Sequence, residues 1–195
     1  MTSTRDRLLD VAEQRFARSG IAAVTTREIV EAAGQRNTSA VSYHFGSREG
    51  LLAAILRRRG GPIDIERGRR RASLGDASHR DLIACLVVPY SAMLDDGGGR
   101  AYLRIVDQLR GRFTAWRIES DVESTAQLAA ILDEIERGID ASPALRRERI
   151  VALIMLMTSS IADRARRLDD GEVPELDHDD YLANLVDMCA AVLQA

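Results

Sequence analysis

Apolar residues recur at the three- and four-residue spacing of amphipathic helices along the chain, and no segment alternates apolar and polar residues as a half-buried strand does. Glycines and residues with N-capping side chains separate these periodic segments. The chain has 195 residues and is 46% hydrophobic, which is enough for a buried core and excludes a low-complexity disordered chain. The sequence therefore predicts an all-α protein.

The apolar segments are too short for a membrane protein, because none approaches the length of about 18 apolar residues that a spanning helix needs. Residues 1–10 are polar and do not resemble a secretion signal. Cys85 and Cys189 lie in separate apolar segments, where we expect them to be buried and unpaired. We expect a soluble cytoplasmic protein with no cofactor and no membrane partner.

Capping and glycine signals divide the chain into helices. Helices are expected over residues 5–18, 26–33, 38–44, 48–59, 62–74, 78–94, 100–117, 121–139, 143–168 and 179–193. Ser3 with Asp6, Thr25 with Glu28 and Ser78 with Asp81 have the spacing of N-terminal capping pairs. Pro89 is expected to kink its helix, and residues 95–99 are expected to form a loop.

Gly60, Gly61 and Pro62 predict a hinge that separates two domains. We call residues 1–60 the head and residues 61–195 the body. The head holds ten Arg and six Asp or Glu, a net charge of +4, and the body holds seventeen Arg and twenty-four acids, a net charge of −7. All 27 basic residues are Arg, whose forked guanidinium suits phosphate. This asymmetry favours a polyanionic partner for the head.

The expected third helix has two different faces. On a helical wheel Val41 and Phe45 share one face, whereas Ser39, Ser42 and Tyr43 point the other way. A helix this short is unstable alone, so its apolar face must be supported by the rest of the head. Two short helices joined by a glycine-containing turn are typical of a helix-turn-helix, whose second helix enters the DNA major groove. An ordinary surface helix rich in small polar residues is the alternative.

The helix-turn-helix interpretation assigns two sets of contacts. The residues expected to reach base edges are Gln35, Arg36, Asn37, Thr38, Ser39 and Ser42, with Ala40 against a thymine methyl group. The residues expected to contact phosphate are Thr26, Arg27, Tyr43, His44 and Arg48. Tyr43 and His44 could instead be packing residues. Arg57, Arg58 and Arg59 are interpreted as a solvated cluster at a helix C-terminus.

Residues 5–56 resemble the DNA-binding domain of the TetR (tetracycline repressor) family of bacterial transcriptional regulators. The matching segments are Leu9-Asp10-Val11-Ala12-Glu13 through Phe16 and Gly20, Thr25-Thr26-Arg27-Glu28-Ile29 with Ala32-Ala33-Gly34, and Val41-Ser42-Tyr43-His44-Phe45-Gly46-Ser47-Arg48-Glu49 with Leu51-Leu52. The turn between Gly34 and Phe45 is one residue longer than the commonest family pattern. The resemblance implies a double-stranded DNA operator of roughly palindromic sequence, a homodimer joined through the last two helices, repression, and a small-molecule effector bound in the body.

The body offers candidates for two of these expectations. Residues 150–161 are apolar nearly all round, which favours a subunit interface. A largely apolar effector pocket is predicted from Tyr90, Met93, Tyr102, Phe113, Trp116 and Met155, although each alone could be a core residue. The arginines at 104, 110, 112 and 117 either select an anionic effector or form surface ion pairs.

The sequence gives little support for a metal site, a phosphate-binding loop or an enzyme active site. Asp177-His178-Asp179-Asp180 has the composition of a helix start, so no metal site is predicted. Gly97-Gly98-Gly99 lacks the Lys-Ser/Thr of a phosphate-binding loop. With three His in the chain and no spacing typical of a catalytic triad or carboxylate pair, we predict a protein without catalytic activity. An all-α enzyme and a scaffold that binds through its last helices are the alternatives.

Overall fold

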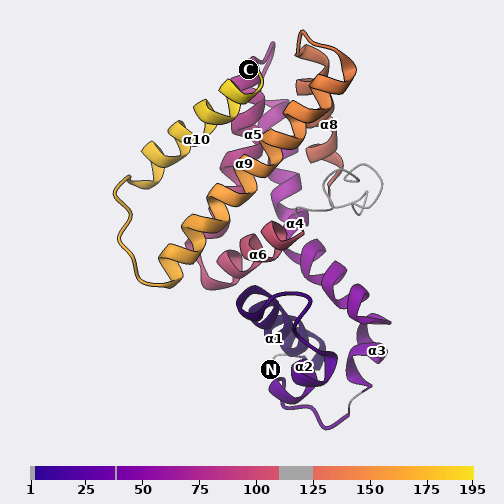
Figure 1. Cartoon of the computed structure of the whole chain (residues 1–195). Coiled ribbons are helices and arrows are strands. Elements are labelled where there is room, and N and C mark those ends of the chain that lie inside the picture. The colour runs from indigo at the N-terminus through magenta and orange to yellow at the C-terminus, as the bar shows by residue number, and fades with distance from the viewer. Residues whose placement is uncertain (1–2, 38, 110–124) are drawn as a thin grey trace.

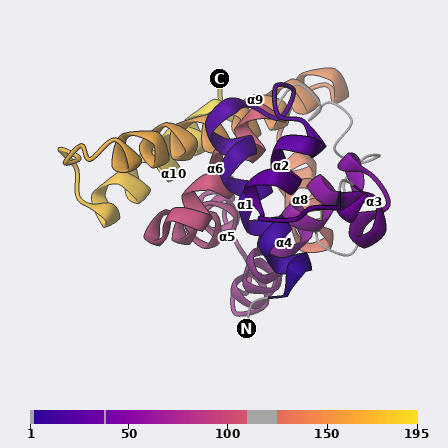
Figure 2. The ribbon, with the colours of Figure 1, turned by 90° about the horizontal axis from the view of Figure 1, so that it is seen from below.

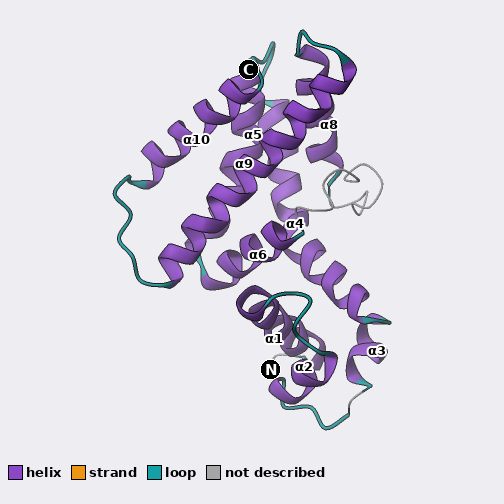
Figure 3. Cartoon of the chain, viewed as in Figure 1, coloured by secondary structure: helices purple, strands orange, loops and turns teal. Residues whose placement is uncertain are grey.

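The computed structural model describes residues 3–37, 39–109 and 125–195, and all regular elements in these ranges are helical, as Figure 3 shows. The elements are α1 Thr4–Ser19, α2 Thr26–Ala32, α3 Ala40–Phe45, α4 Arg48–Ala72, α5 His79–Ser91, the 3-10 helix η1 Ala92–Asp95, α6 Gly97–Gln108, α8 Ala126–Gly138, α9 Pro143–Asp169 and α10 His178–Val192. The predicted all-α fold is confirmed.

The head is built from α1, α2, α3 and the first half of α4, at the lower end of the molecule in Figure 1. Phe16, Ile29, Val41 and Leu51, one from each helix, are buried in a shared core. Burial of these apolar side chains is what holds the short α2 and α3 in helical form.

The predicted capping pairs are confirmed. The Asp6 backbone N–H donates to Ser3 Oγ at 3.1 Å. At α2 and α5 the capping is reciprocal, since the side chains of Thr25 and Ser78 accept from the backbone three residues on, while Glu28 and Asp81 accept from the capping residue's own N–H. These local bonds place the helix starts where the sequence predicts them.

The hinge predicted at Gly60-Gly61-Pro62 is wrong, because α4 runs through these residues without a break. Ile55 is buried in the head core and Ile63 in the core of the body, so the helix is held on both sides of the proline. Pro62 removes one backbone hydrogen bond, to the carbonyl four residues earlier, and its ring is exposed. One long helix therefore connects the head to the body.

The loop predicted for residues 95–99 is also corrected, because Gly97, Gly98 and Gly99 form the first turn of α6. Asp96 caps this turn, since its Oδ1 accepts from the Gly98 and Gly99 backbone N–H groups at 2.8 Å each. Pro89 lies in the last turn of α5, which ends at Ser91 and continues as η1 rather than as one kinked helix.

Gly99 lies close to the backbone of η1, and replacing it tests this contact. A β-carbon at this position would overlap the Met93 carbonyl group. We expect Gly99→Ala to lower the free energy of unfolding by about 2 kcal/mol, as measured by urea denaturation. Gly97→Ala is the matched control, since its β-carbon would only approach the Arg100 side chain, at 3.7 Å. Equal stability of the two variants would contradict the predicted overlap.

The body surrounds a second, larger core. Helix α5 lies inside, with α10 packed along one side, and α9 runs beside α10 and packs against α6 as well (Figure 1). From α10, Leu182, Leu185, Val186 and Cys189 are buried in this core. Cys189 and Cys85 are both buried and free, as predicted, and burial raises the pKa of Cys189 to about 12.

Helix α6 belongs to both parts of the molecule. Its Ala101 and Ile105 side chains are buried in the head core, while Tyr102 and Leu103 are buried in the body core. Because adjacent residues of one helix face different cores, a shift of α6 would disturb both. Seen from below, α3 lies at the edge of the molecule opposite α10 (Figure 2).

Candidate nucleic-acid interface

Helix α3 presents the polar face that the sequence predicts. Val41 is 2% exposed, and Phe45 is half-buried beneath the Arg5 guanidinium, 5.1 Å from its ring centre. Ser42 is exposed, and Tyr43 is 83% exposed. One expectation is corrected, because Ala40 is buried against the head core, where it cannot meet a thymine methyl group.

Tyr43 and His44 form a pair at the C-terminal end of α3. Their ring centres lie 4.9 Å apart in an edge-to-face arrangement. His44 is half-buried, whereas the Tyr43 ring extends into solvent. Packing therefore accounts for part of His44 but not for Tyr43, whose ring and hydroxyl are available to a partner.

The turn before α3 is organised by its own side chains. Asn37 Oδ1 accepts from the Ser39 backbone N–H at 2.9 Å, which shapes the chain just before α3. Gln35 Nε2 donates to the Ala33 carbonyl at 3.3 Å. Arg36 is exposed, and Thr38 lies outside the described residues. Two of the predicted base-reading side chains thus also have a local structural role.

The side chains predicted to contact phosphate at helix N-termini differ in their exposure and in their partners. Arg27 is 79% exposed and forms an i,i+4 ion pair with Glu31 at 2.7 Å, and Thr26 is half-buried at the first turn of α2. Arg48 instead turns inward, since its Nε donates to the Val24 carbonyl at 3.2 Å and its guanidinium also donates to the Ile21 carbonyl.

These bonds give Arg48 a structural role. Its guanidinium also lies 5.2 Å from the centre of the buried Phe16 ring, a distance typical of a cation–π contact. The side chain thereby fixes the connection between α1 and α2 to the start of α4. A phosphate contact by Arg48 stays a prediction.

Two connections to α1, one from α4 within the head and one from α6 of the body, have no counterpart in the sequence analysis. Glu13 of α1 is 2% exposed and accepts from Arg58 at 2.9 Å and from Arg59 at 3.1 and 3.0 Å. Its position on the apolar face of its helix, three residues before Phe16, was the available signal. The arginines interpreted as a solvated cluster thus include two that join α4 to α1.

The second connection is made by Gln108, the last residue of α6. Its Oε1 accepts from the Ile21 backbone N–H at 2.7 Å, and its Nε2 donates to the Phe16 carbonyl at 3.0 Å. A single side chain therefore satisfies two backbone groups at the C-terminal end of α1. A contact between residues 92 positions apart leaves no local signal in a sequence.

The predicted effector residues are only partly brought together. Tyr90 and Tyr102 are buried with their ring centres 6.3 Å apart, and Met93 is half-buried. Met155 is 44% exposed on α9 and does not share their buried position. Phe113 and Trp116 lie outside the described residues, as do the arginines at 110, 112 and 117. Arg104 pairs with Asp169 at 3.3 Å, which confirms the ion-pair interpretation for this residue.

The described residues contain no cluster of three or more His, Cys, Asp or Glu side chains placed to hold a metal ion. Asp177 is the N-cap of α10 and accepts from the Asp180 backbone N–H at 2.8 Å, so this acidic run starts a helix. Within the same residues no helix is long and apolar enough to cross a membrane.

Comparisons with known proteins agree with this geometry. Residues 8–55 match the family model of the bacterial regulatory proteins of the tetR family. The HTH-type transcriptional repressor KstR2 of Rhodococcus jostii is 36% identical over 91 residues, which are 46% of this chain and 43% of that protein. The alignment thus spans less than half of that relative's length.

Solved structures show the same fold along the whole chain. Mycobacterium smegmatis AmtR has a TM-score of 0.57 at 22% identity and covers 100% of this chain and 87% of its own. A putative TetR-family transcriptional regulator from Rhodococcus sp. has a TM-score of 0.54 at 20% identity, covering 99% and 100%. The helix-turn-helix and the matching family model lead to one conclusion: residues 8–55 form a DNA-binding domain of the kind found in the bacterial regulatory proteins of the tetR family, on a chain that shares its helical fold with solved regulators.

Proposed function

We propose that this TetR-family transcriptional regulator is a ligand-responsive repressor that binds a roughly palindromic operator as a homodimer and is released by a small-molecule effector. The observation that carries the DNA-binding part is the outer face of α3. Ser42 and Tyr43 extend into solvent from a helix that Val41 anchors in the head core. Small polar side chains on a supported helix allow close approach to base edges in the major groove.

The residue roles follow from position. Base edges are assigned to Gln35, Arg36, Asn37, Thr38, Ser39 and Ser42, and phosphates to Thr26, Arg27, Tyr43, His44 and Arg48. We propose residues 1–60 as the DNA-binding domain and residues 61–195 as the effector-binding and dimerisation domain. Arg27, Arg36 and Tyr43 have the longest of the exposed side chains in these sets and are the ones best placed to reach DNA without rearrangement.

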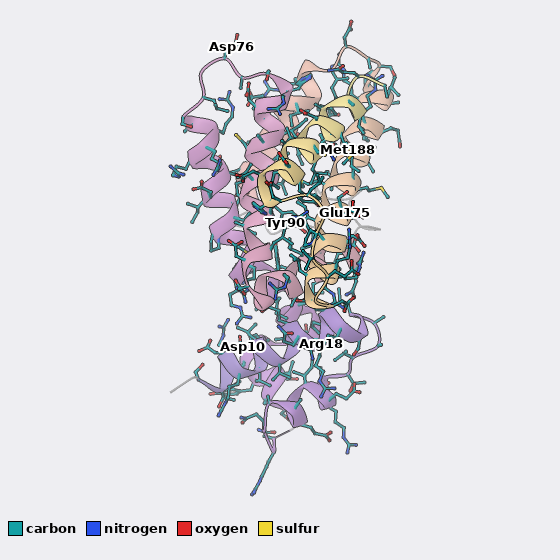
Figure 4. All side chains as sticks on the ribbon, turned by 90° about the vertical axis from the view of Figure 1, so that its left-hand side faces the viewer. Asp10, Arg18, Asp76, Tyr90, Glu175 and Met188 are labelled. Carbon is teal, nitrogen blue, oxygen red and sulfur yellow. The ribbon has the colours of Figure 1, made fainter. Side chains whose placement is uncertain are left out.

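The proposed dimer uses α9 and α10. Met155 of α9 is 44% exposed and Met188 of α10 is 39% exposed, and Figure 4 labels Met188 on the body, far from the head. Large apolar side chains at such exposure favour a subunit interface. A symmetric dimer places two heads on half-sites about 34–36 Å apart, so that two weak contacts reinforce each other.

Release requires that a change in the body alters the separation of the two heads. Helix α6, shared by both cores, and the Gln108 and Glu13 contacts are candidates for carrying that change. An effector that moves α6 would move α1 with it and take the heads out of successive grooves. If a bound effector leaves operator affinity unchanged, this part of the proposal fails.

The experiment that tests the proposal is selection of bound duplexes from a random DNA library, followed by sequencing. A palindromic consensus with half-sites one helical turn apart is the expected result. A bound dimer should be measured in parallel, by light scattering of the protein with and without the selected duplex. A library with no enriched sequence would contradict the proposal.

Substitutions in α3 separate the two kinds of contact. Tyr43→Phe removes a hydroxyl group assigned to phosphate, and we expect it to weaken binding to all sequences alike, by about 10-fold for the two copies in a dimer. Ser42→Ala and Thr38→Ala should instead change which bases are preferred. Fluorescence anisotropy with the selected duplex and its single-base variants measures both effects. A uniform loss in all three variants would show that the face is assigned wrongly.

A further inference from the structure

An arginine is buried inside the body. Arg67, in the second half of α4, is 5% exposed, and its side chain is 7% exposed. Burial lowers the pKa of this guanidinium, because taking a charge out of water is unfavourable unless a partner compensates for it. A buried arginine is therefore expected to have an anion within hydrogen-bond distance.

The described residues do not supply that anion. The nearest carboxylate is Asp64, whose Oδ1 lies 3.8 Å from an Arg67 terminal nitrogen, too far for a hydrogen bond. Both Asp64 oxygens are already used, since they accept from the backbone N–H groups of Gln127 and Leu128 at 2.8 Å each. Asp64 thus caps the start of α8, and Arg67 Nε has no hydrogen-bond partner in the described part of the chain.

Two tyrosines are buried in the same part of the body. Tyr90 and Tyr102 have ring centres 6.3 Å apart, and both are close enough to Arg67 to influence its pKa electrostatically, as Asp64 does. The Tyr90 hydroxyl is buried and has no hydrogen-bond partner among the described residues, and Figure 4 places Tyr90 in the middle of the body. Burial raises the pKa of Tyr102 to about 12, and burial also raises that of Tyr90. Both hydroxyls therefore keep their protons at neutral pH and can donate hydrogen bonds.

One further charge faces this cluster. Asp107 of α6 contributes to the raised pKa of Tyr90. Its carboxylate accepts from Ser159 Oγ at 2.8 Å and lies 3.4 Å from an Arg166 guanidinium nitrogen. The Asp107 carboxylate thus has partners on α9. The Arg67 guanidinium and the Tyr90 hydroxyl can therefore donate to another acceptor.

We propose that Arg67, Tyr90 and Tyr102 form the anion-binding end of the effector site and bind the carboxylate of an organic acid with an apolar body. A guanidinium and two phenolic hydroxyls match the two oxygens of a carboxylate. The charge of Asp64 is held by two backbone N–H groups at the start of α8, so the single positive charge of Arg67 is left to neutralise one negative charge, whereas a dianionic phosphate would leave one buried charge unpaired. Ile63 and Leu103, buried in the same core, supply apolar surroundings. The inference rests on the proposed ligand response and specifies its chemistry.

The test uses the full-length protein and a graded series of straight-chain and aromatic carboxylates, each compared with its methyl ester by calorimetry. We expect the acids to bind the wild type more tightly than their esters. Arg67→Met should weaken acid binding by at least about 30-fold, because truncation removes one partner of a buried charge pair. Ester binding should not change. Arg69→Met is the matched control, since Arg69 lies on the same helix with its side chain 73% exposed.

Thermal unfolding without ligand gives an independent readout. Arg67→Met should unfold at the same temperature as the wild type or higher, since Asp64, 3.8 Å away, keeps both of its backbone N–H donors and the variant removes a buried guanidinium without a hydrogen-bonded anion. A lower unfolding temperature would assign Arg67 a structural role and overturn the proposal. So would esters that bind as tightly as acids, or an absence of acid binding.

Operator binding distinguishes this proposal from the function on which it rests. Arg67→Met should bind the selected duplex as the wild type does, because Arg67 lies in the body. A protein that binds acids but no duplex would overturn the repressor function and leave the carboxylate site standing. A protein that binds its duplex and is released from it by esters as well as by acids would overturn the carboxylate site and leave the repressor function standing.

Discussion

The Glu13→Ala variant is expected to have a free energy of unfolding about 3 kcal/mol lower than that of the wild type. The Glu13 carboxylate is 2% exposed, and Arg58 and Arg59 converge on it from α4. Its hydrogen bonds also raise the pKa of Arg59. Without it, two guanidinium groups face each other at the junction of α1 and α4. Each keeps a second, weaker partner, Asp10 for Arg58 and Asp96 for Arg59, which limits the loss.

Urea denaturation measures this effect, and Glu31→Ala provides the control. Glu31 forms an ion pair of the same kind with Arg27, but both side chains are more than half exposed. Its removal should change the free energy of unfolding by about 0.5 kcal/mol or less. If Glu13→Ala loses no more stability than Glu31→Ala, the buried Glu13 ion pairs do not hold α4 to α1.

The sequence predicts best what is determined within a few residues. The helix starts after Ser3, Thr25 and Ser78 depend on hydrogen bonds that span three residues, and all three are found where the spacing places them. The inner face of α3 follows from helical geometry once Val41 and Phe45 are recognised as its apolar residues. Local chemistry was therefore sufficient to predict the helices and the exposed face of α3.

The errors arise where distant packing overrides a local preference. Gly60-Gly61-Pro62 favours a break, but Ile55 and Ile63 are buried in two cores that the sequence does not place on either side of it. Gly97, Gly98 and Gly99 are poor helix formers, yet the Asp96 cap and the contact of Gly99 with η1 hold them in a helical turn.

The hydrogen-bond partners of side chains in the site could not be predicted from the sequence either. Arg48 has the position of a phosphate-binding residue at a helix start, but the carbonyl oxygens that it binds come from the connection between α1 and α2. Arg67 carried no signal at all, since it lies in an arginine-rich stretch whose other members are exposed or only partly buried. Only the fold shows which arginine of such a stretch is buried.

The affinity for operator DNA is expected to fall by a factor of about 10³–10⁵ between about 50 and 200 mM salt, if the dimer contacts six to ten phosphates. Each neutralised phosphate releases a counterion, so the logarithm of affinity falls linearly with the logarithm of salt concentration. The head, with its net charge of +4, is the source of these contacts, and the body, at −7, opposes them. An enzyme or a scaffold with a structural helix-turn-helix would show no such dependence on any duplex.

Fluorescence anisotropy over a salt series measures the slope of the logarithm of affinity against the logarithm of salt concentration. Single substitutions show which residues contribute to that slope. Arg27→Gln removes one assigned phosphate contact from each subunit and should reduce the slope by about 2 for the dimer. Arg69→Gln removes the same charge from the exposed surface of the body and should leave the slope unchanged. Equal slopes for Arg27→Gln and the wild type would show that α2 is not part of the DNA interface. A slope near zero for the wild type would mean that the exposed face of α3 does not bind DNA.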